Sequence, residues 1–434
     1  MAALTRRNFA RFLALSGSAA LFPDRLLSQP EVELEEIGLS SAPLPPAPAE
    51  PDERYWKEVR SRFLLPADLG FLNAANLCPT SLAVVEALDR NTRLYDGNPS
   101  PTTRSKLMEG REEARRLLAA AFRVTPEEIV ITRNTSEGNN IVSSGLQLGS
   151  GDEVLTLSDN HPSNLAAWRE KAKRFGFTVI TLEQPKPHPG PEYYLDAVRK
   201  AITPRTKVLA FTHVTNSVGD AFPAAELCSL AREQGVLSLL DGAQSCGILA
   251  IDISTVRPDF YTGSAHKFLC GPKETGVLYL NRAVHERIWP SIVSLYPGAV
   301  GISRTFESTG QRDEAAMSAL GDAVSFQLAI GRAAIEARGR ELAQAFMRDL
   351  SALPGVTVYT STDPRRSASV VTFKPAALDP RKLGAALYER DRIAVTARAG
   401  TDRPGVRLSP HIYNTLADVE RTVSAIRRYV ASGL

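Results

Sequence analysis

The chain has 434 residues, and its 51 lysines and arginines against 48 aspartates and glutamates give a formal net charge of +3 at pH 7. With 43% hydrophobic and 23% charged residues it has the composition of a globular protein long enough for two or three domains, which excludes a disulfide-stapled miniprotein and a disordered chain. The near-neutral balance, without a long Lys/Arg run, predicts no nucleic-acid partner.

The first residues, 1–27, have the pattern of an export signal. Arg6 and Arg7 stand ahead of an apolar stretch, residues 12–22, that ends before Pro23. A twin arginine before a short apolar run is typical of a twin-arginine signal segment. The run is far shorter than the roughly 20 residues that span a bilayer. We therefore expect the twin-arginine export machinery as a partner and a periplasmic or otherwise extracytoplasmic location, with a short basic amphipathic helix as the alternative.

Residues 28–52 are rich in Pro, Ala, Ser and Glu, a composition that builds no core and predicts an extended linker. No later segment resembles it, so the rest of the chain is expected to form one compact unit. Within that unit we predict an N-terminal segment, 53–75, that packs with a small C-terminal domain, 305–434. A large cofactor-binding domain would span 76–304.

Beyond residue 55, short apolar runs alternate with helical segments. The apolar runs stand at 129–132, 153–157, 178–182, 207–212, 236–240, 260–262 and 275–280, and the helical segments at 81–92, 111–121, 164–175, 195–201 and 223–234. Apolar strands without inside-out alternation, separated by helices, predict an α/β fold with a mostly parallel sheet covered on both faces.

The last part of the chain changes character. One long helix is predicted from 317 to 350, followed by strands near 357–359 and 369–373. This pattern predicts a smaller α+β domain.

Ligands of parallel α/β sheets lie at the carboxyl ends of the strands, so the polar residues there are the candidates. After 129–132, Thr135 and Ser136 open a helix whose free N–H groups suit a phosphate, or simply form a helix cap. After 153–157, His161 and Asn164 stand in what is equally well a turn and helix cap.

Asp241 and Lys267 follow two successive predicted strands. Each of these charged residues follows an apolar run. Burying such a charge is costly unless the carboxylate and the amine lie close together. A carboxylate that keeps a ring nitrogen protonated, with an amine that forms a Schiff base and moves protons, is what a pyridoxal phosphate enzyme needs.

The four cysteines, Cys78, Cys228, Cys246 and Cys270, show no CxxC spacing. The spacing encodes neither a zinc site nor a disulfide framework. We expect small core residues and no metal.

Five short strings occur in order along the chain, and two longer ones follow them. They are Asn134-Thr135-Ser136-Glu137, His161 with Asn164, His213-Val214-Thr215-Asn216, Asp241-Gly242-Ala243-Gln244, Ser264-Ala265-His266-Lys267, then the segments 307–313 and 407–415. In this order and spacing, from Phe71 onward, the chain resembles the class V aminotransferase family of fold-type I pyridoxal phosphate enzymes. Within it the chain is most similar to the branch of isopenicillin N epimerase and the cysteine desulfurase-like lyases.

The resemblance implies a role for each matched residue. Lys267 would hold pyridoxal 5'-phosphate covalently and shuttle the Cα proton, Asp241 would pair with the ring nitrogen, and His161 would stack on the ring. The remaining cofactor contacts would come from Gln244 and Asn216 at the phenolic oxygen and from Thr135, Ser136, Ser264 and His266 at the phosphate.

The resemblance also implies a homodimer with shared active sites, because in this family a neighbouring subunit commonly completes the phosphate site with a Thr that follows a Gly. Here the pair is Gly310-Gln311, so Gln311 stands where the family has threonine.

For the substrate, Arg398 matches the family's arginine that clamps the α-carboxylate, a task suited to a bidentate guanidinium. Arg407 is the alternative, interpreted as structural. Asn73 resembles the start of the substrate-side loop, although turn formation alone also accounts for it.

The reaction type stays open at this point. Cysteine desulfurases use a thiolate from a mobile loop in the C-terminal region, and this chain has no Cys after Cys270. Transamination, epimerisation and elimination from a modified cysteine remain, and a non-catalytic cofactor-binding protein is the rival from another class.

Overall fold

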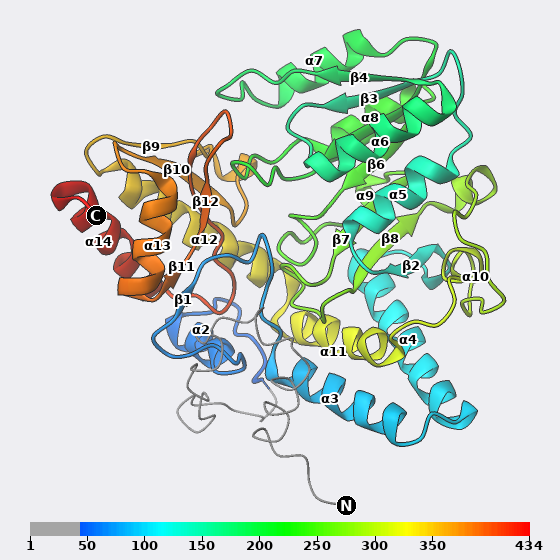
Figure 1. Cartoon of the computed structure of the whole chain (residues 1–434), viewed down its shortest axis with the longest axis horizontal. Helices are drawn as coiled ribbons and strands as arrows, with labels where there is room; N and C mark the ends of the chain where they lie inside the picture. The colour runs from blue at the N-terminus through cyan, green and yellow to red at the C-terminus, as the bar shows by residue number, and fades with distance from the viewer. Residues whose placement is uncertain (1–43) are drawn as a thin grey trace, which may run out of the picture. The chain divides into compact units, whose positions relative to one another are not determined.

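The computed structural model describes residues 44–434, so the predicted signal segment and most of the predicted linker lie outside the described residues. Its larger part contains a seven-stranded sheet. The strands are β2 (Ile129–Thr132), β3 (Glu153–Leu157), β4 (Thr178–Leu182), β5 (Thr206–Thr212), β6 (Leu237–Asp241), β7 (Phe260–Ser264) and β8 (Gly276–Leu280). Their order is β2-β8-β7-β6-β5-β3-β4, and only β8 runs antiparallel to its neighbours (Figure 1).

Helices cover both faces of this sheet. Its central strands are therefore buried on both sides, as their apolar sequences require. One face packs against α4 (Pro101–Phe122), α7 (Pro191–Ala201), α8 (Ala224–Glu233) and α11 (Glu314–Ile330). The other packs against α5 (Thr135–Gly145) and α6 (Pro162–Phe175). The edge strand β4 is partly exposed.

The C-terminal part contains a four-stranded antiparallel sheet in the order β12-β13-β10-β9. Its strands are β9 (Val356–Val358), β10 (Val371–Pro375), β12 (Thr396–Arg398) and β13 (Gly405–Leu408), and its core is shared with helices α12 (Arg332–Ser351), α13 (Pro380–Asp391) and α14 (Leu416–Ser432). Strand β1 (Gly70–Phe71) pairs in parallel with β11 (Ile393–Ala394). The remaining α-helices of residues 44–434 are α2 (Glu53–Arg60), α3 (Leu82–Gly97), α9 (Ile253–Val256) and α10 (Ser303–Phe306). The exact domain boundaries stay predictions.

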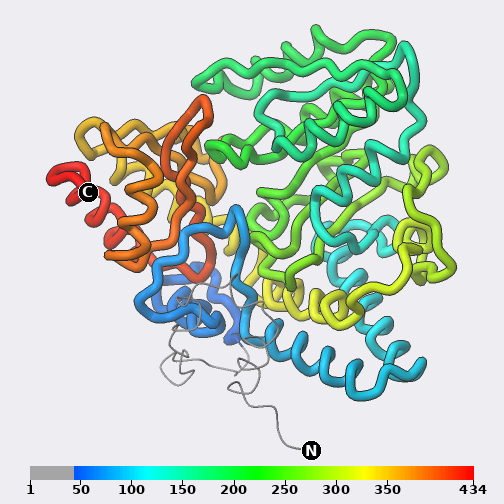
Figure 2. Tube along the Cα trace, in the orientation of Figure 1, coloured from blue at the N-terminus to red at the C-terminus, as the bar shows by residue number. Residues whose placement is uncertain are grey.

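The single helix predicted over 317–350 is wrong, because the structure has two helices there. Helix α11 ends at Gly331, whose φ of +92° lies in the left-handed region that favours glycine. Helix α11 lies along α3 and α4, whereas α12 packs on β9 and β10 (Figure 2). Gly331 therefore turns the chain from one packing surface to another.

The predicted architecture is confirmed: a mostly parallel seven-stranded sheet covered by helices, with a smaller α+β C-terminal part. The predicted apolar runs form strands because each one pairs with its neighbours and its side chains are buried on both faces of the sheet. Within residues 44–434, no helix has the length and apolar character needed to cross a membrane.

A buried ion pair fixes the segment after α10 to the large sheet. The side chains of Arg115 and Glu307 are 0% and 1% exposed, with N–O distances of 2.6 and 2.8 Å between them. Glu307 also accepts a 2.6 Å hydrogen bond from the backbone N–H of Ile131 in β2. The segment that leads to Gln311 is thereby tied to the sheet.

Glu307→Ala is expected to lower the free energy of unfolding by about 3–5 kcal/mol, because it leaves the Arg115 guanidinium buried without its main counter-charge. Chemical denaturation measures the difference. The matched control is Glu113→Ala, which removes an exposed partner of Arg116 on the same helix and should cost less than about 1 kcal/mol. Equal losses in the two variants would contradict the argument.

Candidate active site

Asp241 is the last residue of β6 and forms the centre of a hydrogen-bonded group at the carboxyl edge of the sheet. One carboxylate oxygen accepts from the side-chain amides of Asn139 (2.8 Å) and Asn164 (3.1 Å). The other accepts from the backbone N–H of Ala243 (3.0 Å). Because all three partners donate, Asp241 is held as an acceptor in a site where it is only 1% exposed.

Asn139 is a site residue that the sequence analysis did not identify. It lies four residues after Thr135 and therefore one turn further along the same face of α5. The hydroxyl of Thr262 in β7 donates to its Oδ1 (3.0 Å), which turns the amide nitrogen toward Asp241. That helical spacing is the signal that would have found it.

Lys267 lies in the turn after β7, close enough to Asp241 for their charges to interact. Burial lowers the pKa of the Lys267 ammonium to about 8, Asp241 opposes this shift and Arg407 adds to it. A lysine with this pKa has an appreciable fraction of neutral amine at neutral pH, and the neutral amine is the nucleophile.

His161 is the N-cap of α6, and its Nδ1 accepts a hydrogen bond from the backbone N–H of Ser163 (3.2 Å). Burial and the charge of Lys267 lower the pKa of His161, against the opposing effect of Asp241. A neutral imidazole beside Lys267 and Asp241 is suited to stack on an aromatic ring.

Two of the four predicted phosphate-binding residues meet at the start of α5. The hydroxyl of Ser264 accepts from the N–H of Thr135 (3.0 Å) and donates to its Oγ1 (2.9 Å). Ser136 is instead exposed and lines an outer cavity with Asn134 and Glu137. His266 precedes Lys267 in the turn, and burial, then Lys267, lower the pKa of its imidazole to about 4.

Gln244 has an amide atom available for a ligand. Its Nε2 donates to the carbonyl of Ala75 (3.0 Å), and its Oε1 is buried without a partner in the described chain. Rotating the amide would present its N–H instead.

Together these residues offer a carboxylate for a ring nitrogen, an amine for an aldehyde, and hydroxyls with a helix N-terminus for a phosphate. The site therefore fits pyridoxal phosphate.

Two arginines stand beside this group. Arg398 in β12 and Arg407 in β13 both donate to the backbone carbonyl of Asn216, at 3.4 and 2.9 Å. Burial, then the charge of Arg398, lower the pKa of Arg407 to about 10, and its Nε has no partner. Arg407 was interpreted as structural, but the structure places it next to Arg398 with an N–H to spare. In residues 44–434, neither guanidinium forms a salt bridge with a carboxylate.

The remaining predicted residues are less closely grouped. Asn73 accepts a hydrogen bond from the hydroxyl of Thr396, two residues before Arg398, so it lies beside the arginines. Asn216 contributes its carbonyl there. Gln311 is exposed and lines a surface cavity of about 610 Å³ together with Glu137. Its role in a phosphate site shared between subunits stays a prediction.

The rate at which the apo-protein binds pyridoxal phosphate is expected to rise with pH up to about 8, because the neutral amine of Lys267 is the form that attacks the aldehyde. The rate should then level off, whereas a lysine of ordinary pKa gains neutral amine up to about 10.4. Stopped-flow absorbance measures this. A rate that still rises about tenfold per pH unit above pH 9 would contradict the lowered pKa.

Residues 71–422 match the family model described as aminotransferase class-V. The chain is 30% identical over 387 residues to isopenicillin N epimerase from Streptomyces clavuligerus, covering 86% of this chain and 97% of that one. It is 32% identical over 388 residues to a probable cysteine desulfurase from Halalkalibacterium halodurans (strain C-125), covering 83% and 93%.

Among solved structures the chain is similar to the cystine C-S lyase C-DES in complex with its reaction product cysteine persulfide. The TM-score is 0.76 at 25% identity, over 83% of this chain and 98% of that one. A C-DES variant with glycine covalently linked to its PLP cofactor has the same fold, with a TM-score of 0.77 at 24% identity over 85% and 98% of the chains. The chain belongs to the class V aminotransferase family and is a pyridoxal phosphate-dependent enzyme.

Proposed function

We propose that the enzyme acts at the Cα of an amino acid or amino-acid derivative, as an aminotransferase or as an epimerase similar to isopenicillin N epimerase. The observation that carries the proposal is Lys267, a buried amine whose pKa is lowered to about 8, next to Asp241 and His161. A lysine that only binds a ligand does not need a pKa near neutral pH. A lysine that takes up a proton and returns it at neutral pH does need one.

Pyridoxal phosphate, when bound, supplies the electron-withdrawing ring that stabilises negative charge at the substrate Cα. Asp241, fixed by its three donors, would hold the ring nitrogen and provide the negative charge that keeps it protonated. Lys267 would carry the proton to and from Cα. Epimerisation would need a second proton donor on the face of Cα opposite Lys267, whereas transamination would need the proton to be placed on another atom.

Arg398 and Arg407 provide the counter-charge for a substrate carboxylate, since neither forms a salt bridge in the described chain. Arg398→Gln is expected to raise KM by about 10- to 100-fold with a smaller change in kcat, because a charge-assisted hydrogen bond contributes about 1.5–3 kcal/mol. Steady-state kinetics measures both constants. Arg392→Gln, at an exposed arginine paired with Asp68, is the control and should leave KM unchanged. An unchanged KM in Arg398→Gln would remove this residue from the substrate site.

A persulfide-forming desulfurase reaction is disfavoured because all four cysteines are buried, which leaves no exposed thiolate to attack a substrate sulfur. Elimination from a modified cysteine needs no enzyme thiol. The likeness to the cystine C-S lyase C-DES makes that reaction the second candidate. The non-catalytic cofactor-binding alternative is set aside, because the chain belongs to a family of enzymes.

Export and assembly complete the proposal. The twin arginine at Arg6 and Arg7 supports passage through the twin-arginine machinery to the periplasm, after folding with the cofactor. The exposure of Gln311 on an open cavity supports a homodimer in which each subunit completes its partner's site.

The test is the visible absorbance of the purified holoenzyme before and after the addition of L- and D-amino acids, without any keto acid. Stoichiometric conversion to the pyridoxamine form identifies an aminotransferase. A band that persists while the substrate changes configuration identifies an epimerase, and release of pyruvate and ammonia identifies a lyase. If no amino acid changes the spectrum or is consumed, the proposed action at the Cα of an amino acid is refuted.

A further inference from the structure

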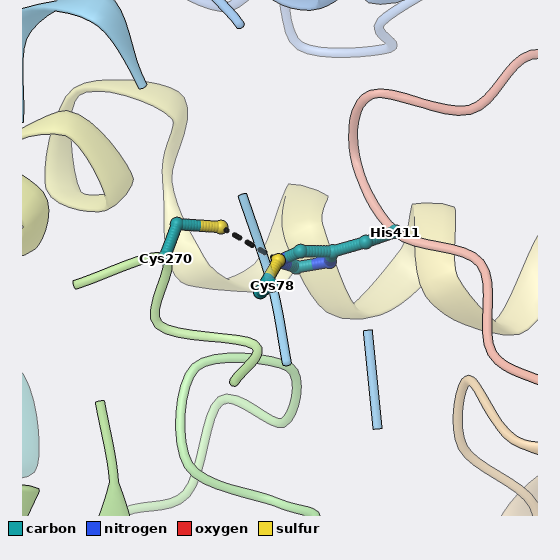
Figure 3. A group of neighbouring side chains, drawn as sticks. All are labelled: Cys78, Cys270 and His411. Atoms are coloured by element: carbon teal, nitrogen blue, oxygen red, sulfur yellow. Dashed lines mark hydrogen bonds between the residues drawn. The ribbon is translucent and has the colours of Figure 1, made fainter. Parts of the chain in front are cut away.

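A second cluster of chemically reactive side chains is buried apart from the cofactor-binding groups. The Sγ atoms of Cys78 and Cys270 are 3.5 Å apart, and these sulfurs and a ring nitrogen of His411 all lie within 4.8 Å of one another. The three residues are 1%, 1% and 0% exposed. Figure 3 shows the side chains converging from three different segments.

The hydrogen bonding of His411 leaves one nitrogen free. Its Nε2 donates to the backbone carbonyl of Phe268 (2.7 Å), whereas Nδ1 is buried with no hydrogen-bond partner in the described chain. A histidine that donates one ring N–H to a carbonyl and keeps the other nitrogen unprotonated has the arrangement found in metal-ligating histidines. A buried ring nitrogen without a hydrogen-bond partner is otherwise an unfavourable feature.

We propose that Cys78, Cys270 and His411 form a structural zinc site. Two thiolates and an imidazole are the donors that Zn²⁺ prefers, and thiols about 3.5 Å apart can both reach a central ion at the usual Zn–S distance of about 2.3 Å. The Cys78 thiol also donates to the hydroxyl of Tyr413 (3.6 Å), which lies beside these three residues.

The charge balance favours a divalent ion. Binding releases one proton from each thiol, so two thiolates and Zn²⁺ form a neutral group, which a buried core tolerates. Apolar residues such as Phe63, Ala74 and Ile412 pack around the cluster, and the Lys273 ammonium lies 3.4 Å from the backbone carbonyl of Cys78.

The site would join parts of the chain that are distant in sequence. Cys78 and Cys270 are 192 residues apart, and Cys270 lies three residues after Lys267. The backbone N–H of Cys78 already donates to the carbonyl of His266 (2.8 Å), and His411 holds Phe268. The ion would therefore fix the Lys267 turn to the segments on either side of it.

The test uses the full-length holoenzyme, stripped of metal under reducing conditions and then titrated with Zn²⁺ against a chromophoric chelator. We expect one equivalent bound per chain, a rise in melting temperature, and a thiolate-to-metal charge-transfer band when Co²⁺ replaces Zn²⁺. Cys78→Ser and Cys270→Ser should each lose the band and most of the affinity. Cys228→Ser and Cys246→Ser, at buried cysteines outside the cluster, should keep both.

X-ray absorption of the zinc-loaded wild-type protein provides a test that needs no variant to fold. The expected first shell contains two sulfurs and one imidazole nitrogen. A shell of oxygen and nitrogen alone, or less than about 0.1 equivalent of Zn²⁺ retained against the chelator, would overturn the proposal. A Cys78–Cys270 disulfide found in non-reduced peptides of the purified protein would also overturn it.

Discussion

Replacing Lys267 with alanine is expected to abolish turnover and the visible band of bound cofactor while leaving the fold intact. The side chain lies in a turn held by other groups: its neighbour Phe268 is bound through its carbonyl by both Gln327 and His411. Loss of the amine removes both the covalent attachment and the proton carrier. General acid–base catalysis alone contributes about 10²–10⁴-fold in rate.

Visible absorbance measures the bound cofactor, kcat measures turnover, and the melting temperature measures whether the fold is intact. Lys207→Ala is the matched control, because Lys207 is an exposed lysine at the other end of β5 from the site. The control should keep the band and the activity. A yellow, active Lys267→Ala protein would refute the assignment of Lys267.

Asp241→Ala is expected to cost far more in rate than in folding, with a loss of about 100- to 1000-fold or more in kcat. The variant removes the negative charge opposite the ring nitrogen, so the ring loses its proton and withdraws electrons less strongly. It also leaves the amides of Asn139 and Asn164 without their acceptor. A melting-temperature decrease of several degrees is therefore expected beside the rate loss.

The control for this variant is Asp259→Ala. Asp259 also accepts hydrogen bonds within the large sheet, from the backbone N–H and the hydroxyl of Ser238, but it lies at the start of β7, away from Lys267. Its loss should lower stability without lowering kcat comparably. Wild-type turnover in Asp241→Ala would show that the interpretation of the strand-end charges is wrong.

The sequence predicted the sheet and the central pair of the site for the same physical reason. Strands buried on both faces are continuous apolar runs, and for β2, β3 and β4 the predicted bounds agree with the structure at both ends. Parallel strands bring their carboxyl ends to one edge, so Asp241 and Lys267 had to lie near each other.

Other features depend on geometry that the order of residues does not reveal. The break at Gly331 requires a positive φ, and an isolated glycine in a helical pattern does not specify one. The approach of Arg407 to Arg398 depends on the antiparallel register of β12 and β13. Cys78, Cys270 and His411 lack the local spacing by which metal sites are recognised, so only the fold brings them together.

We expect this pyridoxal phosphate enzyme to move the Cα proton of an amino acid through Lys267. The most direct measurement is the incorporation of solvent deuterium at Cα, followed by mass spectrometry in heavy water. The holoenzyme would be offered L- and D-amino acids, cystine and isopenicillin N. We expect exchange at Cα of at least one of these compounds with the wild-type protein and none with Lys267→Ala. A cofactor-loaded wild-type protein that exchanges none of them, or exchange that persists in Lys267→Ala, would contradict the account.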